Sequence, residues 1–250
     1  MSYKNYISLG YFCNVASDLE ELGLRNTSSP FDWNISLFEG VIKAIDNEFD
    51  EFMMYDNLVQ SEKYRQNYYD PKYKMWFFHD FNKYESLKKQ YGKVKEKYYR
   101  RISLFLKNIN EQTLFFRYIF NEPGFESEIN WIEKNNAYIE KVIKKHNPKN
   151  KILYIGDELT HSDIVSIFNI QKDKDDLVSR HPIINNVELK KIIDNESIEG
   201  QLDNIKRFKN KEFQKKSLKH MIMKRYRAGI LALKNQGTYR HEKSHYWDNK

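Results

Sequence analysis

One cysteine in the chain lies where a thiol could act as a nucleophile. Cys13 follows a short apolar run that ends at Gly10, and it begins a helical pattern. The free backbone N–H groups and the positive dipole end of a helix lower a thiol pKa and favour the thiolate, and the same N–H groups can hold an oxyanion. A lone cysteine is also commonly a small buried hydrophobic residue. Position alone leaves both interpretations open.

A histidine at the end of an aromatic run is the candidate base. His79 follows residues 75–78, and an imidazole that titrates near neutrality could deprotonate Cys13 or a substrate hydroxyl. Asp80 would point to the opposite face of the same strand. We therefore expect Asp32, in the loop after the Cys13 helix, to orient the imidazole, although Asp32 also fits a turn or cap.

Other polar and aromatic side chains could bind a substrate. Asp157 and Glu158 follow an apolar run and have His161 nearby, so they could hold a divalent ion or a ribose, but such a pair is also common in a strand-to-helix turn. We expect no metal and no cofactor, because glycine-rich nucleotide motifs and HExxH are absent and one cysteine excludes a Cys-rich zinc site. The substrate-binding residues that we expect are Asn14, Trp33, Arg117, Asp157 and Glu158.

The surrounding pattern alternates short β-rich runs with helical stretches. Strands are expected at 6–9, 75–78, 114–120, 152–155 and 177–179, and helices at 13–22, 36–45, 87–105 and 129–143. This alternation predicts an α/β fold with a mostly parallel sheet and helices on both faces, in a Rossmann-like arrangement. Ligands bind at the carboxyl ends of such strands, so we expect one cleft to be shared by Cys13, His79, Asn121, Glu122, Asp157 and His181.

Charge divides the chain into two parts. The net charge is +7, but residues 206–250 carry 14 basic and 3 acidic side chains, or +11, which leaves −4 for the remainder. We expect an α/β catalytic domain at 1–205 and a basic amphipathic helical tail at 206–250. The tail could bind an anionic membrane surface or pack back on the domain. Nucleic acid is a less favoured partner, because no recognised nucleic-acid motif is present.

Composition limits the class of protein. With 40% hydrophobic residues the chain can build a core, which excludes wholesale disorder. No apolar run approaches the roughly 18 residues of a membrane span, and the first residues lack a secretory signal pattern. We therefore expect a cytoplasmic protein, which would lie at the inner face of the membrane if the tail binds lipid rather than the domain.

Several spaced motifs carry a family resemblance. Ile7-Ser8-Leu9-Gly10 with Cys13, then Ser29-Pro30-Phe31-Asp32-Trp33, then Phe78-His79-Asp80-Phe81 resemble a bacterial family described as papain-like cysteine peptidases, over roughly residues 5–160. The resemblance implies a thiol enzyme with Cys13 as nucleophile and His79 as base. In papain-like enzymes the third catalytic residue is an Asn or Asp that comes after the histidine in the chain. Here Asn121 and Asp157 come after His79, whereas Asp32 comes before it. Such enzymes also have an antiparallel sheet, which conflicts with the parallel pattern, and for the fold we follow the periodicity.

These observations lead to three hypotheses. The first is a thiol enzyme of bacterial surface-polysaccharide loci that hydrolyses or transfers an acyl or amide group of a peptide or glycan. The second is a glycosyl- or phosphoribosyl-type transferase of surface glycan assembly, in which His79, Asp32 and Asp157 act on a sugar phosphate. The third is a binding protein with an inert, buried Cys13.

Overall fold

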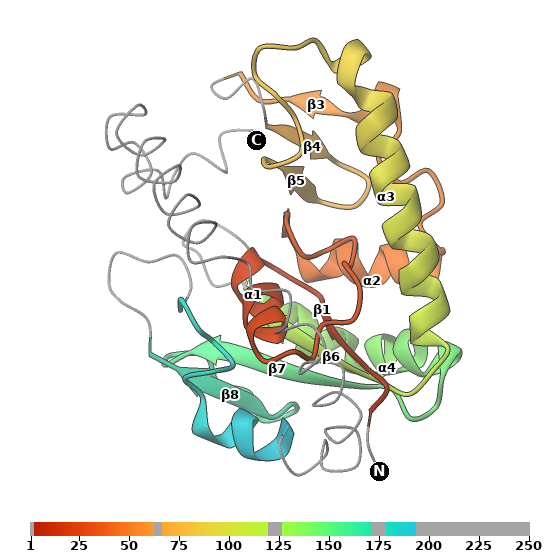
Figure 1. Cartoon of the computed structure of the whole chain (residues 1–250). Coiled ribbons are helices and arrows are strands. Elements are labelled where there is room, and N and C mark those ends of the chain that lie inside the picture. Colours follow the sequence, from red (N-terminus) through yellow and green to blue (C-terminus); the bar gives the residue numbers. More distant parts are fainter. Residues whose placement is uncertain (1–2, 63–66, 120–126, 172–178, 194–250) are drawn as a thin grey trace, which may run out of the picture.

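The computed structural model describes residues 3–62, 67–119, 127–171 and 179–193. These residues form two four-stranded sheets with helices packed around them (Figure 1). The elements in chain order are β1 (Asn5–Ser8), α1 (Cys13–Glu21), β2 (Ile35–Ser36), α2 (Phe38–Asp46), the short 3-10 helix Tyr55–Asn57, β3 (Val59–Gln60), β4 (Tyr68–Asp70), β5 (Met75–Phe77), α3 (Leu87–Ile109), β6 (Thr113–Tyr118), α4 (Glu128–His146), β7 (Lys151–Asp157) and β8 (Ile167–Ile170). Residues 187–193 are also helical.

The first sheet is parallel and has the order β1-β6-β7-β8. Ile7 is in register with Phe115, and Phe116 is in register with Leu153. All six residues of β6 are buried, as expected for a central strand whose two faces are covered by other elements. This sheet confirms the predicted α/β class and the parallel pairing.

Helices cover both faces of the parallel sheet. On one face, Phe115 and Tyr154 pack into a core cluster with residues of α2, α3 and α4. On the other face, Phe116 and Ile155 pack with Val15 of α1 and with residues 183–193. The prediction of helices on both faces is therefore confirmed, and the start of α1 lies on the second face, near the sheet's carboxyl edge.

The second sheet is antiparallel, with the order β2-β5-β4-β3, and it is a finding that the sequence did not predict. Met75 pairs with Ser36 and Asp70, so β5 lies in this sheet and its predicted place in the parallel sheet was wrong. The hydrophobic run identifies a strand, but its partner depends on contacts far along the chain.

Helix α3 joins the two sheets. Its Tyr98 ring lies 5.2 Å from the ring of Phe77 in β5, and its Phe105 ring lies 6.3 Å from that of Phe115 in β6. Figure 1 shows this helix running along the molecule from the antiparallel sheet to the parallel one.

Several predictions fall outside the described residues. These are the fifth strand except for Ser179, which is not in a strand, together with Asn121, Glu122, the domain boundary near 205 and the basic tail. The strand β8 was not predicted, and it supplies the fourth position of the parallel sheet. Among the described helices, none is both long and apolar enough to cross a membrane.

Candidate active site around Cys13

Cys13 is the first residue of α1, as predicted. Phe12 before it is extended and its side chain makes no capping hydrogen bond, so no N-cap side chain satisfies the N–H groups of the first turn. The apolar residues Val15 and Leu19 hold the helix against the sheet. The thiol is half-buried, and its Sγ lies 3.4 Å from Oδ1 of the neighbouring Asn14.

The expectation of a lowered thiol pKa was wrong. Burial raises the pKa of Cys13 to about 11, because removing water from the sulfur disfavours the thiolate more than the nearby backbone N–H favours it. In the resting protein at neutral pH the group is therefore a thiol. A nucleophilic role needs a base that takes the proton during attack.

We predict a pH dependence of stability that is specific to Cys13. Because its folded pKa of about 11 lies above its ordinary value of 9.0, the neutral thiol stabilises the fold below pH 9, and this contribution is lost as the pH rises to about 11. The loss is about 2–3 kcal/mol. Urea unfolding measures this effect. The unfolding free energy of wild type minus that of Cys13→Ala should fall by this amount between about pH 8 and about pH 11, and a constant difference would contradict the raised pKa.

A chain of hydrogen bonds joins the start of α1 to the carboxyl ends of β6 and β7. The Asn14 side chain donates to the backbone carbonyl of Ser179 at 2.7 Å, and the Ser179 N–H donates to the Tyr118 hydroxyl at 3.2 Å. That hydroxyl in turn donates to Asp157. The structure thus brings Cys13, Asn14 and Asp157 to one edge of the parallel sheet. Cys13 and Asp157 are two of the residues for which the sequence predicted a shared cleft.

A second contact between α1 and residues 179–184 comes from Asp18, one turn further along the helix. Its carboxylate is fully buried and lies 2.9 Å from Nδ1 of His181. It also accepts hydrogen bonds from the backbone N–H groups of Ile183 at 2.8 Å and Ile184 at 3.2 Å. His181 is therefore held beside α1 by a carboxylate.

His79 reaches the start of α1 through aromatic rings. Phe12 stacks on Phe78 with ring centroids 5.9 Å apart, and the Phe78 ring lies 4.1 Å from the His79 ring. The protein atoms around the imidazole lower its pKa, against the opposing charge of Asp80, so the neutral form predominates at pH 7. Asp80 itself binds Lys97 and Tyr98 of α3. Within the described contacts, His79 has no hydrogen bond to Cys13 or to a carboxylate.

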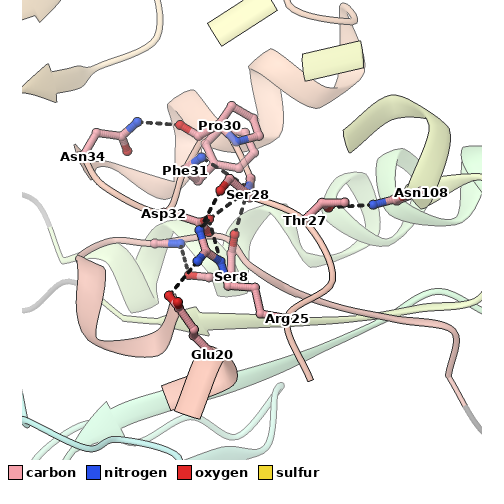
Figure 2. A network of polar contacts seen from close by, with 12 residues as sticks. Ser8, Glu20, Arg25, Thr27, Ser28, Pro30, Phe31, Asp32, Asn34 and Asn108 are labelled. Carbon is pink, nitrogen blue, oxygen red and sulfur yellow. Dashed lines mark hydrogen bonds and ion pairs between the residues drawn. The ribbon is translucent and has the colours of Figure 1, made fainter. Parts of the chain in front are cut away.

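Asp32 belongs to a separate network, which Figure 2 shows in close view. Its buried carboxylate accepts from Arg25 Nε at 3.1 Å and Nη2 at 2.6 Å, and from the Ser29 N–H at 2.8 Å. Burial raises the pKa of Asp32, and the Arg25 charge opposes this. The Arg25 guanidinium also lies 5.5 Å from the Trp33 ring. These contacts fix the loop after α1, and within the described residues they do not join Asp32 to either histidine.

Arg117 is fully buried, and all five of its N–H groups have partners in the protein. Nε and Nη2 donate to Glu128 at 2.9 and 2.5 Å, and the remaining bonds go to the Leu9 carbonyl and to the hydroxyl and carbonyl of Ser36. This arrangement leaves the guanidinium no donor for a substrate.

The remaining predicted residues do not form a metal site. Glu158 is exposed, and no group of three His, Cys, Asp or Glu side chains within the described ranges is arranged to hold a metal ion. A cavity of about 530 Å³ lies against α4 and the first residues of β7, at the opposite end of that strand from Asp157. Cys13 and His79 do not line it.

Sequence reasoning missed Asp18 and Tyr118. Asp18 carried a usable signal, because it is a charged residue on the same helical face as the apolar Val15 and Leu19. A buried carboxylate on such a face must have partners. Tyr118 carried no signal, since a tyrosine in a buried strand is ordinary core.

Comparison with known proteins gives the family. Residues 4–147, more than half of the chain, match a family model described as "Putative papain-like cysteine peptidase (DUF1796)". The chain is also 31% identical, over 176 residues, to the uncharacterized protein R408 of Acanthamoeba polyphaga mimivirus, a match that covers 58% of this chain and 79% of the viral protein. The likeness is therefore not confined to bacteria. No solved structure matches the chain significantly. The chain belongs to this papain-like cysteine peptidase family.

Proposed function

We propose that this protein is a thiol hydrolase in which Cys13 attacks the carbonyl carbon of an acyl or amide substrate. The observation that carries the proposal is the half-buried thiol at the start of α1, beside first-turn N–H groups that no N-cap side chain satisfies, within the segment that matches the family. Such N–H groups can stabilise the oxyanion that forms when the thiol adds to a carbonyl.

The reaction needs a neutral imidazole beside the thiol. As the sulfur–carbon bond forms, the thiol proton passes to the imidazole, which then gives it to the leaving group as the carbonyl–leaving-group bond breaks. A water molecule next loses a proton to the imidazole and bonds to the carbonyl carbon, and the proton returns to sulfur as the thioester breaks. The candidates for this step are His79 and His181. His79, which the sequence predicted as base, lies beside Phe78, which stacks on Phe12 just before α1, whereas His181 bonds to Asp18 of α1.

Acylation by p-nitrophenyl acetate tests the nucleophile. Cys13 is the only cysteine of the chain, so a burst of p-nitrophenolate together with one acetyl group located on Cys13 by mass spectrometry reports this thiol alone. We expect Cys13→Ala to abolish the burst and to lower steady hydrolysis at least about 100-fold.

The matched variant Ser17→Ala changes an exposed residue one turn along the same helix and should keep the burst. An equal burst from Cys13→Ala and wild type would refute the proposal. The family description and the viral relative name no transferase, glycan or membrane, so those alternatives stay predictions from sequence.

A further inference from the structure

We propose that His181, positioned by Asp18, is the imidazole that exchanges protons with Cys13. This inference rests on the proposed thiol hydrolase. Residues 179–184, which carry His181, thereby become part of the site, although they lie beyond the residues matched by the family model.

The first support is the path of the segment that carries His181. Asn14 and Asp18 are four residues apart and lie on one side of α1. Ser179 is bonded to Asn14 and Ile183 to Asp18, so the chain between them follows the helix from its first turn to its second. Cys13 directly precedes Asn14 and contacts its side chain, which places the thiol at the beginning of this path.

The second support is the orientation of the ring. A buried carboxylate that accepts from Nδ1–H fixes the tautomer in which Nε2 has a free lone pair, and this form of imidazole can accept a proton. Asp18 is fully buried, whereas the His181 side chain is 47% exposed, so one nitrogen is anchored and the other edge of the ring remains accessible.

The third support comes from the other histidines. Within the described residues, His79, His146 and His161 have no hydrogen bond between a ring nitrogen and a carboxylate, and His181 has one. His181 has no hydrogen bond to Cys13 among the described contacts. Catalytic hydrogen bonds are often long or unmade before substrate binds, and we expect this one to form in the substrate complex.

Substituting His181 by Asn separates catalysis from structure. The Asn amide can occupy the place of Nδ1 and still donate to Asp18, which keeps the tie between the segment and α1, but no base remains. With p-nitrophenyl acetate we expect the rate of Cys13 acylation at pH 7 to fall about 100-fold, while the melting temperature stays close to that of wild type. His79→Asn tests the other candidate base, and we expect it to lower the acylation rate far less than His181→Asn does.

The pH profile gives a second readout that a purely structural role would not change. In His181→Asn the acylation rate should keep rising toward the thiol ionisation at about pH 11, so its deficit relative to wild type should narrow over that range. Asp18→Asn should lower the rate at pH 7 at least about 10-fold, because the ring loses its fixed tautomer.

The outcomes distinguish the two proposals. If His181→Asn were acylated at the wild-type rate and His79→Asn were acylated much more slowly, this inference would be overturned. The thiol hydrolase proposal would then be retained, with His79 as the base. Absence of acylation of Cys13 in the wild type at any pH would overturn both.

Discussion

Replacing Glu128 by Gln is expected to lower the free energy of unfolding by about 3–5 kcal/mol. The Glu128 carboxylate holds the buried Arg117 guanidinium by two bonds and also accepts the first N–H of α2, from Phe38, at 3.0 Å. A Gln amide would turn an N–H donor toward these donors, and an Arg side chain cannot lose its proton. The change therefore leaves a positive charge in the core without a counter-charge.

Urea denaturation at neutral pH measures this effect. Glu140→Gln is the matched control, because Glu140 forms an exposed pair with Lys144 in the same helix, and its loss should cost no more than about 0.5 kcal/mol. Arg117→Met should recover part of the stability when it is combined with Glu128→Gln, since the unpaired charge is then gone. Similar stabilities for Glu128→Gln and Glu140→Gln would show that the buried pair contributes little.

Gly40→Ala is expected to disrupt the packing between α2 and the turn before β5. A Cβ on Gly40 would lie 1.7 Å from the carbonyl oxygen of Tyr73 and 2.5 Å from its carbonyl carbon. The obstacle is backbone, so α2 or the turn must move, and the Leu37 N–H bond to the Lys74 carbonyl would be strained. We expect a loss of at least about 3 kcal/mol, or failure to fold.

Gly92→Ala is a control for which we expect a change in stability of the opposite sign. Gly92 is exposed in the interior of α3, and a Cβ there would meet nothing within 4 Å. Alanine at such a position should raise stability by up to about 1 kcal/mol, because glycine is a poor helix former. Thermal unfolding of the two variants should therefore give shifts in opposite directions, and equal shifts would contradict the close approach at Gly40.

The fold could be predicted from sequence where the signal is local. The strands at β1, β6 and β7 and the helices α1, α3 and α4 follow from hydrophobic periodicity, and the structure has them. The antiparallel sheet could not be predicted, since β2 and β3 have two residues each and β5 has no local feature that specifies its partner. The strand β8 is short and only its last residue is buried, so its pattern is weak.

For the candidate site, the positions of some residues could be predicted from the sequence, but the thiol pKa and the side-chain partners could not. The helix start at Cys13 and the position of Asp157 at a strand end follow from the chain pattern. The thiol pKa was predicted with the wrong sign, because sequence shows the helix dipole but not the burial that outweighs it. The carboxylate partner of His181 depends on which distant segments meet, and this is why Asp18 was not recognised.

The position of β7 has a consequence for how the protein can be divided. The family match ends at residue 147, but β7, which begins at Lys151, lies between β6 and β8 in the parallel sheet. A chain shortened to the matched segment would leave the backbone of β6 unpaired along one side and uncover the apolar surface of Phe116. The region defined by sequence similarity is therefore smaller than the unit that folds, and recombinant fragments should extend at least through residue 193.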